Sequence, residues 1–256
     1  MTVVACKCGK TAIELLEARP RFTAQCCCTD CFYRAQAFAE RSKVPLPAAM
    51  AMRTRGTDAV YFGAALRLVR CGGGAGAGLR RSMLHCDGMA THLGAPCCGS
   101  CLLVDHPSYA GRCVAAFRGA VKFEPRNGAA VLRAALEDAP PPLPSSALRW
   151  MTCDLTAQQR AALEPLEPSA EEEDEAFERF CVAMQAGVSA ELLRAPGAAT
   201  FAELCAERPA GGDATSSPAL EFLFESPRRA DGAWIRIRSS VLRPRGTRGS
   251  GYGVQG

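Results

Sequence analysis

Cysteines gathered within a few residues of one another are the side chains of this sequence best suited to chemistry. Cys26, Cys28 and Cys31 form a C-x-C-x-x-C motif. Because only two residues separate the last pair, both thiolates can reach one tetrahedral metal ion from a single turn, and Cys26 adds a third ligand. Single buried cysteines usually behave as small hydrophobic residues, so ordinary core thiols are the alternative interpretation. The clustering favours a metal site.

A second and shorter pair, Cys6 and Cys8, lies upstream and is followed by Gly9. A glycine at this point can take the positive φ angle that a metal-binding knuckle often needs. The sequence contains fifteen cysteines, an odd number, in a chain of 256 residues. At this length and without a secretion signal, thiolate–metal chemistry is a better interpretation than a disulfide framework.

Composition and charge narrow the class of protein. The first residues lack a basic segment before an apolar run, so we predict no signal peptide. No apolar segment reaches the length of a membrane span, and the formal charge of +4 does not by itself indicate nucleic-acid binding. We therefore expect a cytoplasmic protein with no membrane partner, and a nuclear location stays open.

Hydrophobic patterning predicts the elements that must position the cysteines. A helix is expected over residues 29–41, directly after the C-x-C-x-x-C motif, with an apolar stripe formed by Phe32, Ala35, Phe38 and Ala39. Short strands are expected over residues 10–17, 59–62 and 65–69. Residues 113–117 and 120–124 are expected to form a pair of strands joined through Arg118 and Gly119.

The chain changes character near residue 126. We expect a zinc-binding domain over residues 1–126, an Ala- and Pro-rich accessory region over 127–242 and a disordered basic tail over 243–256. Arginines of the tail could touch RNA, but such tails more often only improve solubility.

Short helices are the main feature expected in the accessory region. Ser169 and Glu172 have the spacing of a capping box and predict the start of a helix. Its apolar stripe consists of Phe177, Phe180, Cys181 and Met184. Further helices are expected over residues 129–137 and 200–207, and a strand over 234–237.

A third cysteine motif, Cys97-Cys98-Gly99-Ser100, lies far downstream of the other two. The three motifs in this order resemble the family of glutathione-dependent formaldehyde-activating enzymes and centromere protein V. The usual pattern of that family is C-x-C-G, then C-H-C-x-x-C, then F-C-x-x-C-G-S-x-L, followed by two strands around a glycine turn. Residues 111–121 stand at a fitting distance for those strands. The resemblance covers the first 125 residues, about half of the chain.

This sequence departs from the family pattern at two of the motifs. Cys27 stands where the family commonly has histidine, and the third motif has adjacent cysteines, Cys97 and Cys98, instead of a two-residue gap. A competing register would use Cys86, with Met89 in place of the second cysteine. Zinc prefers thiolate to thioether ligands, so that register would give a weaker site. The spacing to the downstream strands favours the register that uses Cys97 and Cys98.

The resemblance implies a mainly β fold of the Mss4-like, β-tent type that binds two zinc ions per chain, with an α-rich C-terminal extension. It implies a structural zinc ion held by Cys6, Cys8, Cys97 and Cys98. It also implies a catalytic zinc ion with an open fourth position, held by Cys26, Cys28 and Cys31. The implied function is that of a zinc-dependent carbon–sulfur lyase or transferase acting on a thiol–aldehyde adduct, with a small thiol such as glutathione as partner.

A non-catalytic zinc module for protein or chromatin binding is the alternative function. The irregular third motif, the extension and the basic tail favour it, whereas the intact middle motif favours the enzyme. A redox switch built on Cys98 and Cys101 is a weaker third hypothesis, because the expected strand–helix setting is missing. Lys7, Arg34 and Lys43 could attract the carboxylates of a thiol, but scattered surface cations are the simpler interpretation.

Overall fold

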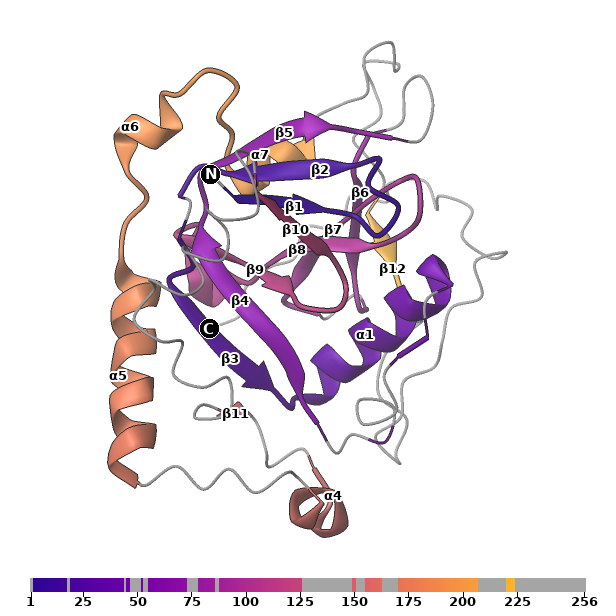
Figure 1. Ribbon diagram of the computed structural model, residues 1–256, viewed down its shortest axis with the longest axis vertical. Helices are drawn as coiled ribbons and strands as arrows, with labels where there is room; N and C mark the ends of the chain where they lie inside the picture. The colour runs from indigo at the N-terminus through magenta and orange to yellow at the C-terminus, as the bar shows by residue number, and fades with distance from the viewer. Residues whose placement is uncertain are drawn as a thin grey trace, which may run out of the picture.

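The computed structural model describes residues 2–17, 19–43, 45–46, 52, 55–72, 78–85, 88–125, 149–150, 155–162, 170–206 and 220–223. These residues form two β-sheets with helices packed around them (Figure 1). The described part of the protein is therefore sheet-rich, as the sequence predicted.

The smaller sheet has four antiparallel strands in the order β10–β1–β2–β5. Their bounds are Thr2–Ala5 for β1, Ala12–Leu15 for β2, Leu66–Arg70 for β5 and Lys122–Pro125 for β10. Every residue of β1 and β2 is buried, so the two central strands of this sheet are covered on both faces.

The larger sheet has eight strands in the order β11–β3–β4–β9–β8–β7–β6–β12. Its first strands in the chain are β3 (Phe22–Cys26), β4 (Thr57–Gly63), β6 (Arg80–Met83) and β7 (Thr91–Gly94). The later ones are β8 (Cys101–Asp105), β9 (Cys113–Phe117), β11 (Arg149–Trp150) and β12 (Glu221–Phe222). The two short edge strands, β11 and β12, pair in parallel with β3 and β6, and the other neighbours are antiparallel.

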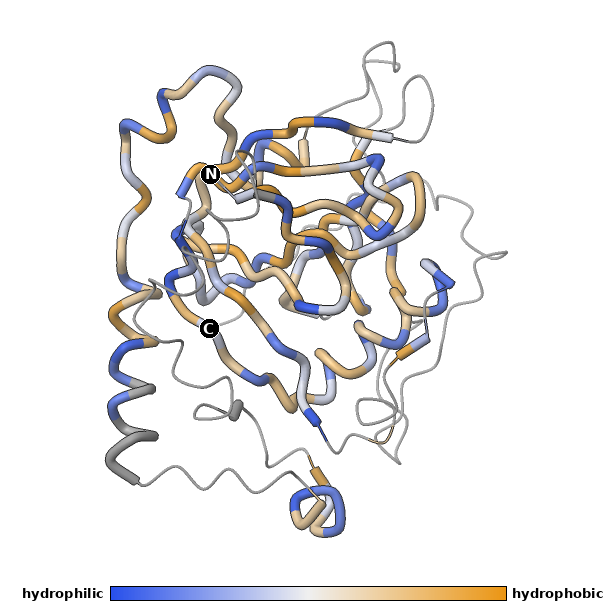
Figure 2. Tube along the Cα trace, in the orientation of Figure 1, coloured by the Kyte–Doolittle hydropathy of each residue, from blue (hydrophilic) through white to orange (hydrophobic). Residues whose placement is uncertain are grey.

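Residues of β4 show how the larger sheet separates two hydrophobic cores. Val60 and Phe62 belong to the core shared with the smaller sheet, whereas Ala59 and Tyr61 belong to the core on the opposite face. Successive side chains of a strand point to opposite faces, so a strand that is covered on both sides needs a continuous apolar run. In Figure 2 the strands contain many hydrophobic residues, with hydrophilic residues between them.

Helices cover both faces of the larger sheet. The two longest, α1 (Thr29–Ser42) and α5 (Ala170–Gln185), pack against the core on the face away from the smaller sheet. The short helix α7 (Phe201–Ala206) contributes Phe201 and Leu204 to the core between the sheets. Three other short helices are η1 (Pro107–Tyr109), α4 (Ala157–Ala161) and α6 (Ala190–Leu193).

Several predicted elements are confirmed. The strands expected over 59–62 and 65–69 lie within or overlap β4 and β5, the strand over 113–117 is β9, and the helix over 29–41 is α1. The strand expected over 10–17 is the shorter β2, and the helix expected over 200–207 is α7. Ser169, the helix over 129–137, the strand over 234–237 and the tail over 243–256 lie outside the described residues.

Two details of the sequence interpretation are wrong. Strands β9 and β10 do not pair with each other, because the turn at Gly119, with φ +84°, sends the chain from the larger sheet to the smaller one. The buried face of α1 also differs from the predicted stripe: Cys31, Arg34 and Phe38 are buried on it, whereas Phe32 is half-buried.

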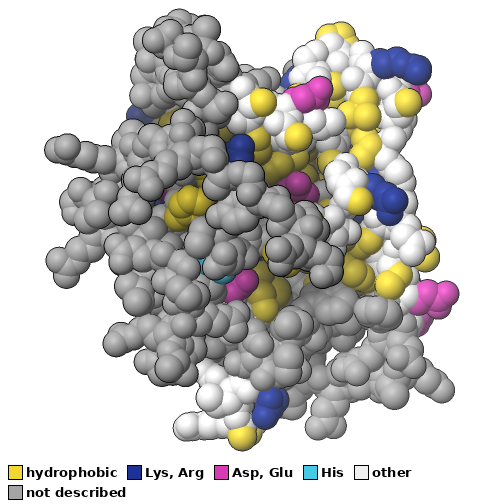
Figure 3. All heavy atoms as spheres, turned by 180° about the vertical axis from the view of Figure 1, so that it is seen from behind, with side chains coloured by type: hydrophobic (Ala, Val, Ile, Leu, Met, Phe, Trp, Pro, Cys, Tyr) yellow, Lys and Arg dark blue, Asp and Glu magenta, His cyan; other side chains and the backbone are white. Residues whose placement is uncertain are grey.

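The described helices include none that is long and apolar enough to cross a membrane. On the reverse side of the molecule, the described Lys and Arg side chains are scattered among polar and hydrophobic ones (Figure 3). On that face they do not gather into a single basic patch.

Candidate metal centres and the adjoining pocket

Four cysteines from two distant turns converge into one cluster. Cys6 and Cys8 lie in the turn between β1 and β2, and Cys97 and Cys98 lie in the turn between β7 and β8. The four sulfur atoms all lie within 4.8 Å of one another. Sγ of Cys6 is 3.4 Å from Sγ of Cys8 and 3.5 Å from Sγ of Cys97. This four-cysteine cluster therefore joins the smaller sheet to the larger one.

Two glycines shape the turns that carry the four-cysteine cluster. Gly9 has φ +78°, as predicted, and its N–H donates to the Cys6 carbonyl at 2.9 Å. Gly99 has φ +68°, and its N–H donates to the Ala95 carbonyl at 2.9 Å. A Cβ atom on Gly99 would lie 2.9 Å from Cβ of Arg41. Any other residue there would be strained by its φ angle and crowded by α1.

Hydrogen-bond donors surround the sulfur atoms of the four-cysteine cluster. The Thr11 backbone N–H donates to Sγ of Cys6 at 3.3 Å. Burial alone would raise the pKa of the Cys98 thiol, but hydrogen bonds from Ser100 and from the Cys8 backbone lower it to about 6. Donors of this kind stabilise thiolates and orient metal ligands.

The second cluster is local in sequence and lies where β3 meets α1. Cys26 ends β3, Cys28 is the N-cap residue of α1, and Cys31 lies in its first turn. Sγ of Cys28 accepts the backbone N–H of Cys31 at 3.2 Å and lies 3.2 Å from Sγ of Cys26. The three sulfur atoms lie within 4.8 Å of one another. A strand end and a helix cap thus fix the three-cysteine cluster.

The three thiols of this cluster differ in acidity. Hydrogen bonds from the Cys26 and Cys28 thiols hold the pKa of Cys31 well below its usual range, and the Arg34 guanidinium lowers it further. Hydrogen bonds with Cys28 and Cys31, together with burial, raise the pKa of Cys26 well above its usual range. Cys31 is therefore the thiol of the three that ionises first.

Arg34 lies one helical turn beyond Cys31 and is 5% exposed. Its Cζ atom lies 3.7 Å from the centre of the Phe117 ring, a cation–π contact. Burial would lower the pKa of Arg34, but negative charge on Cys31 and Cys101 raises it above its usual value. The interpretation of Arg34 as a surface cation is therefore wrong, whereas Lys43 is exposed as expected.

Both clusters have the donor chemistry that zinc prefers. A tetrahedral zinc ion with Zn–S bonds of about 2.3 Å places its sulfur ligands about 3.8 Å apart, close to the sulfur–sulfur spacing of both clusters. The four-cysteine cluster offers a full tetrahedral set of ligands. Among the residues that the structure describes, no histidine or carboxylate joins the three-cysteine cluster, which offers three ligands.

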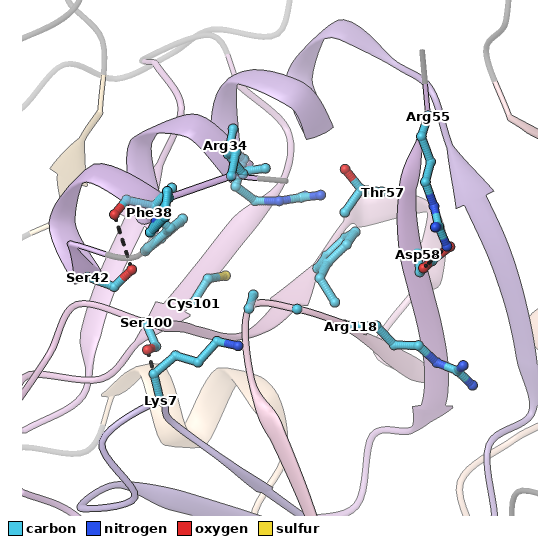
Figure 4. A pocket seen from close by; sticks show the side chains of 17 residues that line it. Lys7, Arg34, Phe38, Ser42, Arg55, Thr57, Asp58, Ser100, Cys101 and Arg118 are labelled. Carbon is cyan, nitrogen blue, oxygen red and sulfur yellow. Dashed lines mark hydrogen bonds and ion pairs between the residues drawn. The ribbon is translucent and has the colours of Figure 1, made fainter. Parts of the chain in front are cut away.

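A pocket of about 440 Å³ opens beside Arg34. Its walls come from α1, from the start of β4, from the end of β9 and from the turn after β9 (Figure 4). Phe38, Ala35 and Phe117 give it an apolar lining, and Cys101 also lines it. Thr57 is shared with a much smaller hollow that Cys26, Cys28 and Phe32 line, so the pocket adjoins the three-cysteine cluster.

All seven cysteines that the sequence singled out as ligands fall into these two clusters. Cys86, which the competing register would use, lies outside the described residues. Cys98 belongs to the four-cysteine cluster whereas Cys101 lines the pocket, which argues against a redox switch formed by the two.

Sequence reasoning missed the pocket and the buried position of Arg34. A signal was present, since Cys31, Arg34 and Phe38 are spaced to share one face of a helix. The contributions of Thr57 and Cys101 had no such signal, because strand pairing across the larger sheet brings them to the helix.

Comparison with family models finds none that matches this sequence, and comparisons with curated proteins and with solved structures also give no match. The family resemblance therefore depends on the cysteine motifs of this sequence alone.

Proposed function

We propose that this protein is a zinc-dependent carbon–sulfur lyase or transferase of the glutathione-dependent formaldehyde-activating type, with an Mss4-like fold. In this proposal the four-cysteine cluster holds a structural zinc ion and the three-cysteine cluster holds a catalytic one. The reaction is the reversible addition of a thiol to a small aldehyde. Addition forms a C–S bond, breaks the carbonyl π bond and moves the thiol proton to the carbonyl oxygen; the reverse reaction cleaves the C–S bond.

The unequal number of ligands is the observation that carries this proposal. Four cysteines form one cluster and three form the other, and the described residues give the second cluster no further donor. Structural zinc sites are usually filled by four protein ligands, whereas catalytic sites keep one position open for water or substrate. The three-cysteine cluster also adjoins a pocket, as a reactive site must.

Residues around the three-cysteine cluster have distinct roles in the proposed reaction. A zinc ion bound there supplies Lewis acidity, which lowers the pKa of a thiol in the fourth position. Arg34 offsets part of the negative charge that three thiolates bring to a buried site. The N-cap geometry at Cys28 keeps its sulfur directed at the cluster before any ligand arrives.

The test measures exchange between free glutathione and its formaldehyde adduct by two-dimensional exchange NMR. Zinc-loaded full-length protein is expected to accelerate exchange above the uncatalysed rate, because a thiolate is a better nucleophile than a thiol. The Cys28→Ser variant should lose this acceleration, since a hydroxyl can still cap α1 but is a poor zinc ligand. Cys181→Ser, which changes a cysteine outside both clusters, is the matched control and should retain it.

Two outcomes would overturn the proposal. One is a protein with zinc in both clusters that leaves the exchange rate unchanged with glutathione and with other small thiols. The non-catalytic zinc module for protein or chromatin binding would then be the better account. The other is acceleration that Cys28→Ser leaves intact, which would place the chemistry elsewhere in the chain.

A further inference from the structure

The charged residues that line the pocket beside α1 are mostly cations. Among the described residues, the charged ones that line it are Lys7, Arg34, Arg55, Arg118 and Asp58. Asp58 is ion-paired with Arg55 at 3.0 Å, so the one acidic side chain among them is already neutralised. The described part of the lining therefore carries net positive charge.

Two of these cations reach into the hollow. In Figure 4, Arg34 extends from α1 and Lys7 from the opposite side, and the ends of both side chains approach the open space between them. Arg118 points away from this space, and Arg55 lies beside Asp58. Lys7 and Arg34 come from distant parts of the chain, so the fold brings these two charges together.

Arg34 retains a hydrogen-bonding capacity that the protein does not use. Arg34 is 5% exposed, and its Nη2 atom, which is itself covered by protein atoms, has no hydrogen-bond partner among the described residues. Part of the guanidinium interacts with Cys31, but a guanidinium has five N–H donors in a rigid fork. A buried donor without a partner is costly, so such a group in a pocket commonly has a ligand as its partner.

The remaining lining narrows the chemistry of that ligand. Phe38, Ala35, Ala39 and Phe117 present apolar surface next to the two cations. A volume of about 440 Å³ suits a small organic molecule and is too confined for a folded protein segment. Two anionic groups of small metabolites, carboxylate and phosphate, match the planar fork of an arginine best.

We infer that this pocket binds a small organic acid, with its carboxylate paired to Arg34 and Lys7 and its carbon chain against Phe38 and Phe117. The inference depends on the proposed function only for the identity of the acid, which would be the carboxylate-bearing thiol that reacts at the three-cysteine cluster. Binding of the acid itself requires neither a thiol nor a reaction.

A probe without a thiol tests the binding directly. Hexanoate and its neutral analogue hexanamide are titrated against zinc-loaded full-length protein by ligand-observed NMR. Hexanoate should bind about tenfold more tightly or better, because hydrogen bonds between two charged groups are stronger than those to a neutral amide. Equal affinity for the acid and the amide would overturn the inference.

Variants locate the site. Arg34→Lys keeps the charge but loses the fork, and Lys7→Gln removes a charge from the opposite wall; each should weaken hexanoate binding several-fold with zinc content unchanged. Lys122→Gln, which removes an exposed cation on β10, should leave binding unaltered. If Arg34→Lys fails to fold, the comparison of hexanoate affinity between Lys7→Gln and Lys122→Gln tests whether the acid binds in this pocket. Equal losses in those two variants would show general attraction to a basic protein and refute the site.

A second comparison separates this inference from the proposed function. Adduct formation is measured with 3-mercaptopropionate and with 2-mercaptoethanol, which lacks a carboxylate. Faster reaction of the acid supports both claims. Hexanoate binding without reaction of either thiol leaves the pocket assignment standing and refutes only the catalytic role. Equal acceleration with both thiols, with no preference for hexanoate, refutes only the pocket assignment.

Discussion

Individual cysteines of the two clusters should differ in what they contribute to stability. Cys8 and Cys97 are 89 residues apart in the chain, so a metal ion between them closes a long loop and ties two sheets together. Cys26, Cys28 and Cys31 are already held close together by the end of β3, the N-cap of α1 and its first turn. Cross-links across long loops restrict the unfolded chain most.

We therefore expect Cys8→Ser and Cys28→Ser to lose one zinc ion each but to differ in melting temperature. Cys8→Ser should lower the melting temperature markedly, because the link between the sheets is lost. Cys28→Ser should lower it much less, since serine is a good N-cap residue. Thermal unfolding and elemental analysis on the same samples check this. Equal destabilisation by the two substitutions, or loss of both zinc ions from either variant, would contradict it.

At the scale of elements, Arg21, which directly precedes β3, links α5 to the larger sheet through hydrogen bonds. Its Nη1 and Nη2 groups donate to the carbonyls of Ala186 and Gly187, just beyond the end of α5, at 2.6 and 3.0 Å. The same guanidinium forms a bidentate pair with Glu17, with both distances 2.6 Å. The Arg21 side chain is 7% exposed and that of Glu17 is 28% exposed, so the ion pair is partly shielded from water, whereas the bonds to the two carbonyls lie at the surface.

We predict that Arg21→Ala destabilises the protein by about 1–3 kcal/mol, because it leaves a partly buried carboxylate and two carbonyls beyond the end of α5 without their partner. Arg179→Ala is the matched control: Arg179 is an exposed arginine paired with Glu175 on α5 itself, and its loss should cost less than about 0.5 kcal/mol. Urea denaturation measures both. Similar costs for the two arginines would show that α5 is not held through Arg21.

Gly63 provides an independent test of the same contact. A Cβ atom there would lie 2.1 Å from Oε2 of Glu17 and 2.9 Å from Nη2 of Arg21. Gly63→Ala should therefore displace this ion pair, and its cost should be much smaller in an Arg21→Ala background. Additive costs in the double variant would mean that the alanine acts on something other than the ion pair.

At the scale of the whole molecule, segments beyond residue 126 are packed into the cores of the two sheets. Phe201 and Leu204 are 4% and 1% exposed within the core between the sheets. Phe180 of α5 contacts Phe22 on the opposite face, with ring centres 5.2 Å apart. All seven candidate ligands nevertheless precede residue 126.

Truncation after residue 126 should therefore keep the ligands but weaken the fold. We expect a shortened chain of low solubility and reduced melting temperature, because two apolar faces become exposed. In the full chain, Phe201→Ala should cost about 3–5 kcal/mol, the usual range for a buried phenylalanine. Circular dichroism, size-exclusion chromatography and urea denaturation test these expectations. A truncated chain as stable as the full one would show that residues 149–223 are not needed for the cores.

The parts of this architecture that sequence reasoning could predict are those with local signals. Spacing alone indicated the three-cysteine cluster, because Cys26, Cys28 and Cys31 lie within one turn of chain. The spacing of apolar residues also predicted helix α1, although it did not predict which face of the helix is buried. The proximity of Cys8 and Cys97 was implied only by the family resemblance, because no local sequence pattern links residues that are so far apart in the chain.

Features that depend on pairing between distant segments could not be predicted in this way. Strand β8 is buried on both faces, so it shows no alternation of polar and apolar residues. Pairing of residues 113–117 with 120–124 was a wrong prediction, because a short glycine turn can also pass the chain between two sheets. The burial of Arg34 was not predicted, because a charged residue on a helix is usually exposed.

Zinc content and coordination of the full-length protein, purified under reducing conditions, test the central claim most directly. Elemental analysis should find about two zinc ions per chain, and X-ray absorption should find an average of between three and four sulfur ligands for each zinc. The average should fall below four because, in the proposed assignment, one of the two ions has only three cysteine ligands. Less than about half a zinc ion per chain, or one ion with four sulfur ligands and none at the three-cysteine cluster, would contradict the account.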